Sequence, residues 1–291
     1  MRTGIALAGI LGSIATTAVL VTWIPASQPA SATPLYDSYV ALGDSFTSGP
    51  GIPPTVSEEC GRSASNYPTL VAEVLNVSRF VDVSCGGAVS GHLTESQATF
   101  RGVGVPPQYE ALTPDTDLVT VGIGGNDIGL VQLAAGCINL LPPPNGQSCA
   151  ATNTAGGADR VDAAIDAFVP RYKTITAEIR QRSPDAKIVF VGYPTAVRDG
   201  GCFPEQRLWP EDATYLQNKL DRLNSAMRQQ VQESGAEFVD LTGSTVGHDV
   251  CADPDTRWME GLSPVAEAIP LHPNAAGHRN AADQVVASLL N

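Results

Sequence analysis

The sequence lacks the patterns that mark common metal sites. It contains no Cys-x-x-Cys pair, which argues against a structural zinc site. It also has no His-Glu-x-x-His motif, in which two histidines on one face of a helix bind zinc. We therefore expect no metal ion and no cofactor.

Basic residues are scarce as well. The chain has 17 Lys and Arg against 30 Asp and Glu, which gives a formal charge of −13 at pH 7. Nucleic acids attract basic surfaces, so this balance argues against a nucleic-acid partner. It also opposes purely electrostatic docking to an anionic membrane.

Charge is absent from Ile5 to Ile24, and Arg2 is the only charged side chain before them. The stretch from Pro25 to Ala32 ends in Ala-Ser-Ala. A basic start, an apolar run and such an ending predict a secretory signal peptide of residues 1–32, cleaved after Ala32. The alternative is an uncleaved anchor, since about 20 apolar residues can span a bilayer. Several Gly, Ser and Thr residues dilute the run, so we expect a secreted monomer without a stable membrane anchor.

Removing residues 1–32 leaves residues 33–291, and losing Arg2 changes the formal charge from −13 to −14. No linker-like segment or internal repeat interrupts this part, which favours one domain. It retains six cysteines, and an even count in an exported protein predicts disulfides. Six cysteines allow fifteen pairings. We favour bonds between cysteines that are neighbours in the sequence, because each bond would then close a local loop. These pairs are Cys60–Cys85, Cys137–Cys149 and Cys202–Cys251.

Short runs rich in β-branched residues alternate with helical periodicity. The predicted strands are 38–42, 79–84, 118–123, 187–192 and 237–241, and the predicted helices are 67–75, 159–182, 211–233 and 275–290. This alternation predicts an α/β fold with a mostly parallel five-stranded sheet covered by helices on both faces. Three long loops, 50–62, 91–114 and 136–157, lie near the cysteines, and loops of this length in a compact domain are usually functional or stapled.

Ser45 directly follows the first strand, in the turn Gly43-Asp44-Ser45. Ligands of open parallel sheets bind beyond the carboxyl ends of strands, so this hydroxyl is a candidate nucleophile. The alternative is that Ser45 is a helix N-cap, a role that serine fills well. The Gly-x-Ser-x-Gly turn of α/β-hydrolases is absent around Ser45.

A serine nucleophile needs a base, which is usually histidine near neutral pH. His272 precedes the last predicted helix, between Leu271 and Pro273, and Asn274 can cap that helix. This constrained loop favours His272 as the base. The remaining histidines are interpreted as surface or loop residues: His92, His248 and His278.

Acyl transfer also needs hydrogen-bond donors for a developing oxyanion. Two glycine pairs that follow strand ends offer them. The first supplies the backbone N–H of Gly87, and the second, Gly124-Gly125, precedes the side-chain amide of Asn126. Either pair alone would be interpreted as a tight turn. The neighbouring carboxylates, Asp44 and Asp127, are expected to hold these turns.

Together, Gly43-Asp44-Ser45, Gly87, Gly-Gly-Asn126-Asp and His272-Pro resemble the SGNH hydrolase superfamily and, more narrowly, the GDSL-like lipases and esterases secreted by actinobacteria. The resemblance covers nearly all of residues 33–291. It implies a flavodoxin-like three-layer α/β/α sandwich, with Ser45 as nucleophile and His272 as base. It also implies an oxyanion hole formed by the Ser45 N–H, the Gly87 N–H and the Asn126 amide, and cysteines joined consecutively, as in the pairing favoured above.

The reactions of this superfamily span lipid esters, phospholipids, acetylated sugars and thioesters, and fold alone does not choose among them. Because we expect the protein outside the cell, we favour a small-molecule or lipid ester as substrate, with acylated polysaccharide or a phospholipid as the alternatives. A non-catalytic lipid- or glycan-binding protein on the same fold is the other class considered. Such a protein would not need Ser45, Asn126 and His272 together.

One position departs from the family pattern. An aspartate commonly lies three residues before the histidine, where it orients the imidazole. Here that position is Ile269. Some actinobacterial relatives use a main-chain carbonyl instead, which gives a Ser–His dyad. We therefore expect the carbonyl of Ile269 to accept a hydrogen bond from His272, with Asp253 or Asp255 as the alternative partner.

Overall fold

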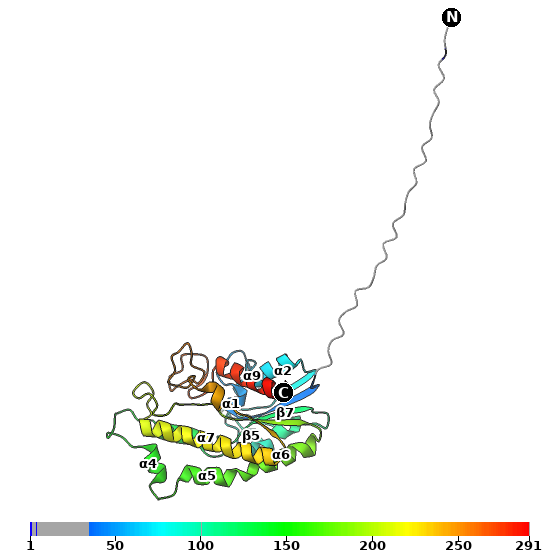
Figure 1. Cartoon of the computed structure of the whole chain (residues 1–291). Coiled ribbons are helices and arrows are strands. Elements are labelled where there is room, and N and C mark those ends of the chain that lie inside the picture. Colours follow the sequence, from blue (N-terminus) through cyan, green and yellow to red (C-terminus); the bar gives the residue numbers. More distant parts are fainter. Residues whose placement is uncertain (2–3, 5–34, 100, 291) are drawn as a thin grey trace. The chain divides into compact units, whose positions relative to one another are not determined.

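The β-branched runs form one parallel sheet at the centre of the protein (Figure 1). We describe a computed structural model, which covers residues 1, 4, 35–99 and 101–290. The strand order is β4-β1-β7-β8-β9, and every neighbouring pair is parallel. The five strands are β1 Ser38–Gly43, β4 Arg79–Asp82, β7 Leu118–Gly122, β8 Lys187–Val191 and β9 Glu237–Val239. The five predicted strands are confirmed, with small differences at their ends.

The helices confirm the predicted periodicity, with one correction. The α-helices are α1 Ser45–Ser48, α2 Tyr67–Leu75, α3 Leu130–Gly136, α4 Cys149–Thr154, α5 Arg160–Phe168, α6 Pro170–Arg182, α7 Pro210–Glu233, α8 Thr242–Thr245 and α9 Ala275–Leu290. The continuous stretch expected at 159–182 is two helices, α5 and α6. Pro170 has no N–H to continue the hydrogen-bond ladder and is well suited to the first position of a new helix.

The predicted long loops contain short elements of their own. Residues 50–62 lead through β2 Thr55–Ser57 to β3 Arg62–Ser63, which pair as an antiparallel hairpin. Residues 91–114 hold β5 Gln97–Ala98, β6 Gly104–Val105 and the 3₁₀ helix η2 Gln108–Ala111, and they follow the start of the 3₁₀ helix η1 Ser90–Leu93.

Alternating side chains of the strands bury the two faces of the sheet against two helical layers. One face packs Tyr39 and Val189 against α2 and α9. The other packs Val40 and Phe190 against α5, α6 and α7. In Figure 1, α2 and α9 lie on one side of the sheet and α5, α6 and α7 on the other. The three-layer α/β/α sandwich is therefore confirmed.

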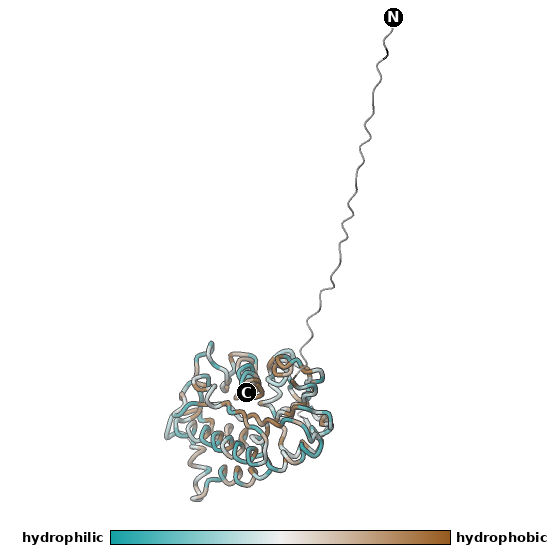
Figure 2. The backbone as a smooth tube through the Cα atoms, turned by 45° about the vertical axis from the view of Figure 1, so that its right-hand side comes forward, coloured by the Kyte–Doolittle hydropathy of each residue, from teal (hydrophilic) through white to brown (hydrophobic). Residues whose placement is uncertain are grey.

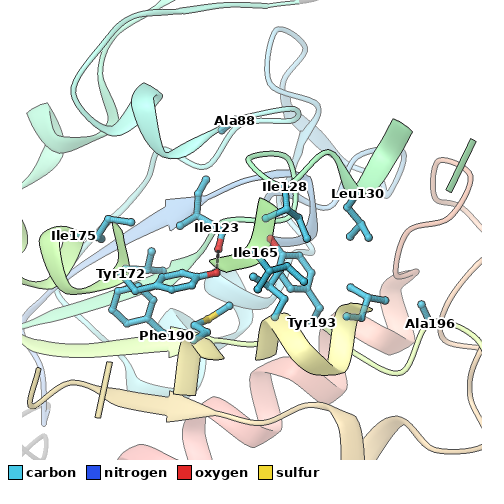
Figure 3. Close-up of a cluster of buried hydrophobic side chains, with 14 of the residues drawn as sticks. Ala88, Ile123, Ile128, Leu130, Ile165, Tyr172, Ile175, Phe190, Tyr193 and Ala196 are labelled. Carbon is cyan, nitrogen blue, oxygen red and sulfur yellow. Dashed lines mark hydrogen bonds between the residues drawn. The ribbon is translucent and has the colours of Figure 1, made fainter. Parts of the chain in front are cut away.

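The larger core cluster lies on the α5–α6–α7 side of the sheet. Figure 2 shows hydrophobic segments of the chain running through the interior of the domain. Figure 3 shows part of this core, where the hydroxyl of Tyr172 donates to the carbonyl oxygen of Ile123 at 3.1 Å. This bond anchors the end of β7 to α6. The turn that carries Asn126 therefore begins from a rigid position.

The strand order places a topological switch point between β1 and β7, because the chain runs outward from β1 to β4 on one side and to β7 on the other. Open α/β sheets bind ligands at such a point, beyond the carboxyl ends of the strands. Ser45 follows β1, Gly87 follows β4 and Asn126 follows β7. The fold thus brings the three predicted residues to one edge of the sheet.

Three disulfides staple the loops around this edge. The structure joins Cys60 to Cys85, Cys137 to Cys149 and Cys202 to Cys251, which is the predicted pairing. The Cys60–Cys85 bridge ties the β2–β3 hairpin to the turn after β4. Cys85 is also held by its N–H, which donates to the Gly43 carbonyl at 3.0 Å.

The predicted signal peptide, residues 1–32, lies outside the described residues except for Met1 and Gly4. In the portion that the structure describes, none of the helices has both the length and the apolar character needed to cross a membrane.

Candidate active site

Ser45 is the first residue of α1, and Asp44 caps this helix. The Asp44 carboxylate accepts the N–H of Phe46 at 2.8 Å, as an N-cap residue does. The interpretation of Ser45 itself as the cap is therefore wrong. The Ser45 hydroxyl is free to face the edge of the sheet, and the side chain is only 7% exposed.

His272 provides the partner of this hydroxyl. Its Nε2 lies 2.7 Å from Ser45 Oγ, although the two residues are 227 positions apart in the chain. The ring of Phe46 packs against the imidazole, with 4.9 Å between ring centroids. Burial lowers the pKa of His272 from its ordinary value of 6.5, while the hydrogen bond to Pro270 acts in the opposite direction. The imidazole is therefore kept neutral and able to accept a proton.

The carbonyl that orients His272 belongs to Pro270, so the prediction of Ile269 is wrong by one residue. His272 Nδ1 lies 2.9 Å from the Pro270 carbonyl oxygen. Because a carbonyl can only accept, Nδ1 carries the hydrogen, and Nε2 is left as the acceptor for the Ser45 hydroxyl. The residue between them, Leu271, has a φ of +61. This left-handed conformation places the carbonyl of Pro270, and not that of Ile269, next to the imidazole ring.

Backbone hydrogen bonds hold the loop that carries Pro270, Leu271 and His272, the histidine loop, in this strained conformation. The N–H of Leu271 donates to Gly261 at 3.2 Å, and the His272 carbonyl accepts the N–H of Glu260 at 2.9 Å. Asn274 caps α9 and also donates to the buried carboxylate of Glu260 at 2.7 Å. Among the described residues, neither Asp253 nor Asp255 contacts His272, and both are exposed. The geometry is that of a dyad supported by a backbone carbonyl.

Hydrogen-bond donors gather next to Ser45. Gly87 lies in a turn closed by the Ala88 N–H and the Cys85 carbonyl, and its φ of +75 explains the need for glycine. Asn126 donates from Nδ2 to the Ala88 carbonyl at 2.9 Å, which leaves the second hydrogen of this amide available. Within residues 35–99 and 101–290, neither the Ser45 N–H nor the Gly87 N–H donates to a protein acceptor.

The two flanking aspartates hold the turns, as expected from the sequence. Asp127 accepts the N–H of Ser90 at 3.0 Å and its hydroxyl at 2.7 Å, which fixes the segment that follows Gly87. Asp44 is fully buried, and this burial raises its pKa to about 7. Hydrogen bonds from Tyr193 and from the Phe46 N–H oppose that rise because they stabilise the carboxylate.

The predicted residues share one open groove of about 560 Å³. Ser45, Gly87, Asn126 and His272 line it together with Ile269. Charged residues of the β2–β3 hairpin and of the loop after β5 also line it, and Glu58 and Arg101 form an ion pair at 3.0 Å.

A second cavity, of about 110 Å³, is also lined by His272 and is almost entirely apolar. It borders the groove, since both are lined by His272 and Val131. Its walls come from α1, α3, the segment after β8, α7 and the histidine loop: Phe46, Leu130, Ala134, Val197, Leu216, Leu220 and Leu271. The site can therefore receive a molecule with one polar and one apolar part.

In the described part of the chain, the other histidines make their hydrogen bonds and ring contacts with residues other than Ser45. His92 lies in η1, and His248 stacks on Trp258 with 3.5 Å between ring centroids. His278 is buried in α9, where its Nδ1 accepts the N–H of Tyr67 at 3.1 Å. The interpretation of His278 as a surface residue is therefore wrong, and burial lowers its pKa to about 3.

Sequence reasoning missed two residues that hold the site. Gln108 of η2 clamps Gly43, accepting its N–H at 2.8 Å and donating to its carbonyl at 2.9 Å. Tyr193 follows β8 and reaches Asp44 with its hydroxyl. The position of Tyr193 after a strand end was the available signal, since the carboxyl ends of parallel strands meet at one edge.

Comparisons with known proteins agree with this geometry. A family model described as the GDSL-like Lipase/Acylhydrolase family matches residues 41–279. Lipase 2 of Streptomyces coelicolor is 37% identical over 269 residues, covering 89% of this chain and 88% of that protein.

Two solved structures have the same fold over nearly their whole length. Phospholipase A1 from Streptomyces albidoflavus gives a TM-score of 0.69 at 27% identity, covering 87% of this chain and 99% of that one. The extracellular lipase from Streptomyces rimosus gives a TM-score of 0.71 at 26% identity, covering 86% and 98%. The chain therefore belongs to the GDSL-like lipase/acylhydrolase family and is an SGNH-type carboxylic ester hydrolase.

Proposed function

We propose that this ester hydrolase works by two-step acyl transfer, with Ser45 as nucleophile and His272 as general base. The Ser45 hydroxyl gives its proton to Nε2 of His272 as Oγ attacks the ester carbonyl. The protonated imidazole then protonates the leaving alcohol, and an acyl-enzyme remains on Ser45. Water, deprotonated by the same imidazole, attacks this acyl-enzyme and releases the acid and the free serine.

The distance of 2.7 Å between Ser45 Oγ and His272 Nε2 carries this proposal. The negative charge that develops on the carbonyl oxygen meets the N–H groups of Ser45 and Gly87 and the free hydrogen of the Asn126 amide. Such preorganised donors are usually the largest single contribution to acyl-transfer catalysis. The carbonyl of Pro270 keeps His272 in the tautomer that the first step requires.

The two compartments lined by His272 support a particular substrate class. The apolar cavity next to His272 suits a hydrocarbon acyl chain, because burial of each methylene contributes about 0.8 kcal/mol. The open groove carries Glu58, Glu59 and Arg101 and suits the polar alcohol part of an ester. Lipid esters with a polar alcohol combine these features, and acylated polysaccharide is the alternative.

We further infer that the protein acts outside the cell. Three disulfides are typical of an oxidising compartment, and the sequence of residues 1–32 has the pattern of a signal peptide. The similarity to an extracellular Streptomyces lipase agrees with this location. N-terminal sequencing of the exported protein tests the predicted cleavage after Ala32.

Labelling with a fluorophosphonate probe tests the assignment of Ser45. The probe phosphonylates an activated serine, so the wild type should be labelled and Ser45→Ala should not. Ser48→Ala is the matched control, since Ser48 lies in the same short helix but does not contact His272. Equal labelling of wild type and Ser45→Ala, or ester hydrolysis that persists in Ser45→Ala, would refute the assignment.

A further inference from the structure

Tyr193 joins the turn of the nucleophile to the turn of the oxyanion donor. Its hydroxyl donates to the carboxylate of Asp44 at 2.7 Å and accepts the N–H of Gly125 at 2.7 Å. Asp44 directly precedes Ser45, and Gly125 directly precedes Asn126. The phenol oxygen of Tyr193 therefore connects the residue before the proposed nucleophile to the residue before the proposed oxyanion donor.

The ring that carries this oxygen is itself immobilised. Tyr193 is 2% exposed and belongs to the large core cluster, where Figure 3 shows it together with Ile128 and Ile165. Its backbone is held from α7 by Asn224, which accepts the Tyr193 N–H at 2.9 Å and donates to the Tyr193 carbonyl at 2.8 Å. The hydroxyl is thus a fixed point between two turns.

The turn after β7 leaves room for this contact only because it begins with two glycines, Gly124 and Gly125. A Cβ at Gly125 would lie 2.9 Å from the Tyr193 hydroxyl, and one at Gly124 would lie 2.3 Å from the Tyr172 hydroxyl. Real Cβ atoms essentially never approach so closely. Two buried tyrosines therefore press against the backbone of this turn and determine its position.

From this arrangement we propose that Tyr193 is a positioning residue for ester hydrolysis, keeping the Asn126 amide at the correct distance from Ser45. The inference rests on the function proposed above, in which Asn126 stabilises the oxyanion. Oxyanion donors act only when they are held in place before the charge develops. Loss of the Tyr193 hydroxyl would leave the Gly125 N–H without its acceptor and allow the turn to shift.

Tyr193→Phe tests the proposal because it keeps the ring and removes the oxygen. We expect kcat to fall by about 10- to 100-fold with little change in KM, since a displaced donor weakens the transition state more than substrate binding. Tyr39→Phe is the matched control. Its hydroxyl is also fully buried and contacts Thr120 at 2.7 Å, but on the opposite face of the sheet. The control should lose comparable thermal stability and keep its kcat.

A double-mutant cycle distinguishes positioning from a general loss of structure. If Tyr193 acts through Asn126, then Tyr193→Phe should have little effect on kcat in the Asn126→Ala background. Effects that multiply in the double variant, or an unchanged kcat in Tyr193→Phe, would overturn the inference. Failure of the proposed function would look different, because Ser45→Ala would then still hydrolyse esters.

Inhibition by an alkyl trifluoromethyl ketone gives an independent readout. Addition of Ser45 Oγ to the ketone carbonyl transfers the serine proton to His272 and places negative charge on the carbonyl oxygen. The inhibition constant should rise in Tyr193→Phe by about the factor by which kcat falls, because both report the oxyanion. An inhibition constant equal to that of the wild type would contradict a role in positioning.

Discussion

The side-chain amide of Asn126 donates to the carbonyl oxygen of Ala88 at 2.9 Å, so the turn after β7 holds the turn that contains Gly87. Asn126→Ala removes this link together with one proposed oxyanion donor. We expect kcat to fall by about 10²- to 10³-fold, the usual cost of losing such a donor. Steady-state kinetics on a soluble ester measures the effect.

Asn153→Ala controls for the loss of an asparagine side chain. The Asn153 amide also donates to a backbone carbonyl, that of Cys149 at 2.9 Å, but it does so within α4. Its kcat should match that of the wild type. If Asn126→Ala has the same kcat as this control, then Asn126 is not part of the oxyanion hole.

The dyad predicts that no aspartate is needed beside His272. Asp253→Asn and Asp255→Asn change exposed side chains, so each should alter the activation free energy by less than about 0.5 kcal/mol. The Pro270 carbonyl already accepts from Nδ1, so neither substitution removes the partner of the imidazole. A collapse of kcat/KM in either variant would show that a carboxylate completes the site.

The pH dependence of kcat/KM should follow the buried imidazole. In the proposed mechanism His272 must be neutral to accept the serine proton, and burial holds its pKa below 6.5. The acid limb that His272 contributes should therefore lie below pH 6.5, where activity declines as the pH falls through the lowered pKa. Measuring kcat/KM for an uncharged ester as a function of pH tests this expectation, because kcat/KM reports the pKa values of the free enzyme.

Asp44 is the other group near Ser45 that titrates close to neutrality, with a pKa of about 7. Asp44→Asn removes this titration, and the acid limb that belongs to His272 should persist in the variant. A limb with its midpoint above 6.5 in Asp44→Asn, or a flat profile, would argue against His272 as the base.

The sequence predicted the parts of the site that depend on local patterns. Buried parallel strands are continuous apolar runs, so the sequence locates the ends of β1, β4 and β7, and with them the candidate residues Ser45, Gly87 and Asn126, which share one groove. The carbonyl beside His272 was misplaced because it depends on the positive φ of Leu271, which loop contacts impose. Tyr193 also follows a strand end, but the partners of its hydroxyl are identified only once β8 is placed beside β7.

A series of esters with increasing acyl-chain length should show whether the acyl chain binds in the apolar cavity or in the groove. In the wild type, kcat/KM for a series of p-nitrophenyl esters should rise by about fourfold per methylene until the cavity is filled. Ala134 lines the cavity, so Ala134→Leu should end this rise at a shorter chain. Ala135→Leu adds the same side chain at an exposed neighbouring position outside the cavity and should leave the series unchanged. Identical series in the two variants would place the acyl chain elsewhere.

The disulfides should differ in their contributions to stability according to the loops they close. Chain-entropy arguments give about 4 kcal/mol for the separation of 49 residues between Cys202 and Cys251 and about 3 kcal/mol for the 12 residues between Cys137 and Cys149. Replacement of both cysteines by serine should therefore lower the free energy of unfolding more for the first pair, as urea titration measures.

The Cys60–Cys85 bridge should affect activity as well as stability. Cys60 lines the groove, and its carbonyl accepts the N–H of Gly86 at 2.9 Å, next to the candidate donor Gly87. Cys60→Ser with Cys85→Ser should thus lower kcat under conditions where the variant is fully folded. The matched Cys137→Ser and Cys149→Ser pair should keep the wild-type kcat under the same conditions. Equal kcat values in both pairs would mean that the bridge at Cys60 contributes only to folding, and that Asp127 and Asn126 suffice to hold the Gly87 turn.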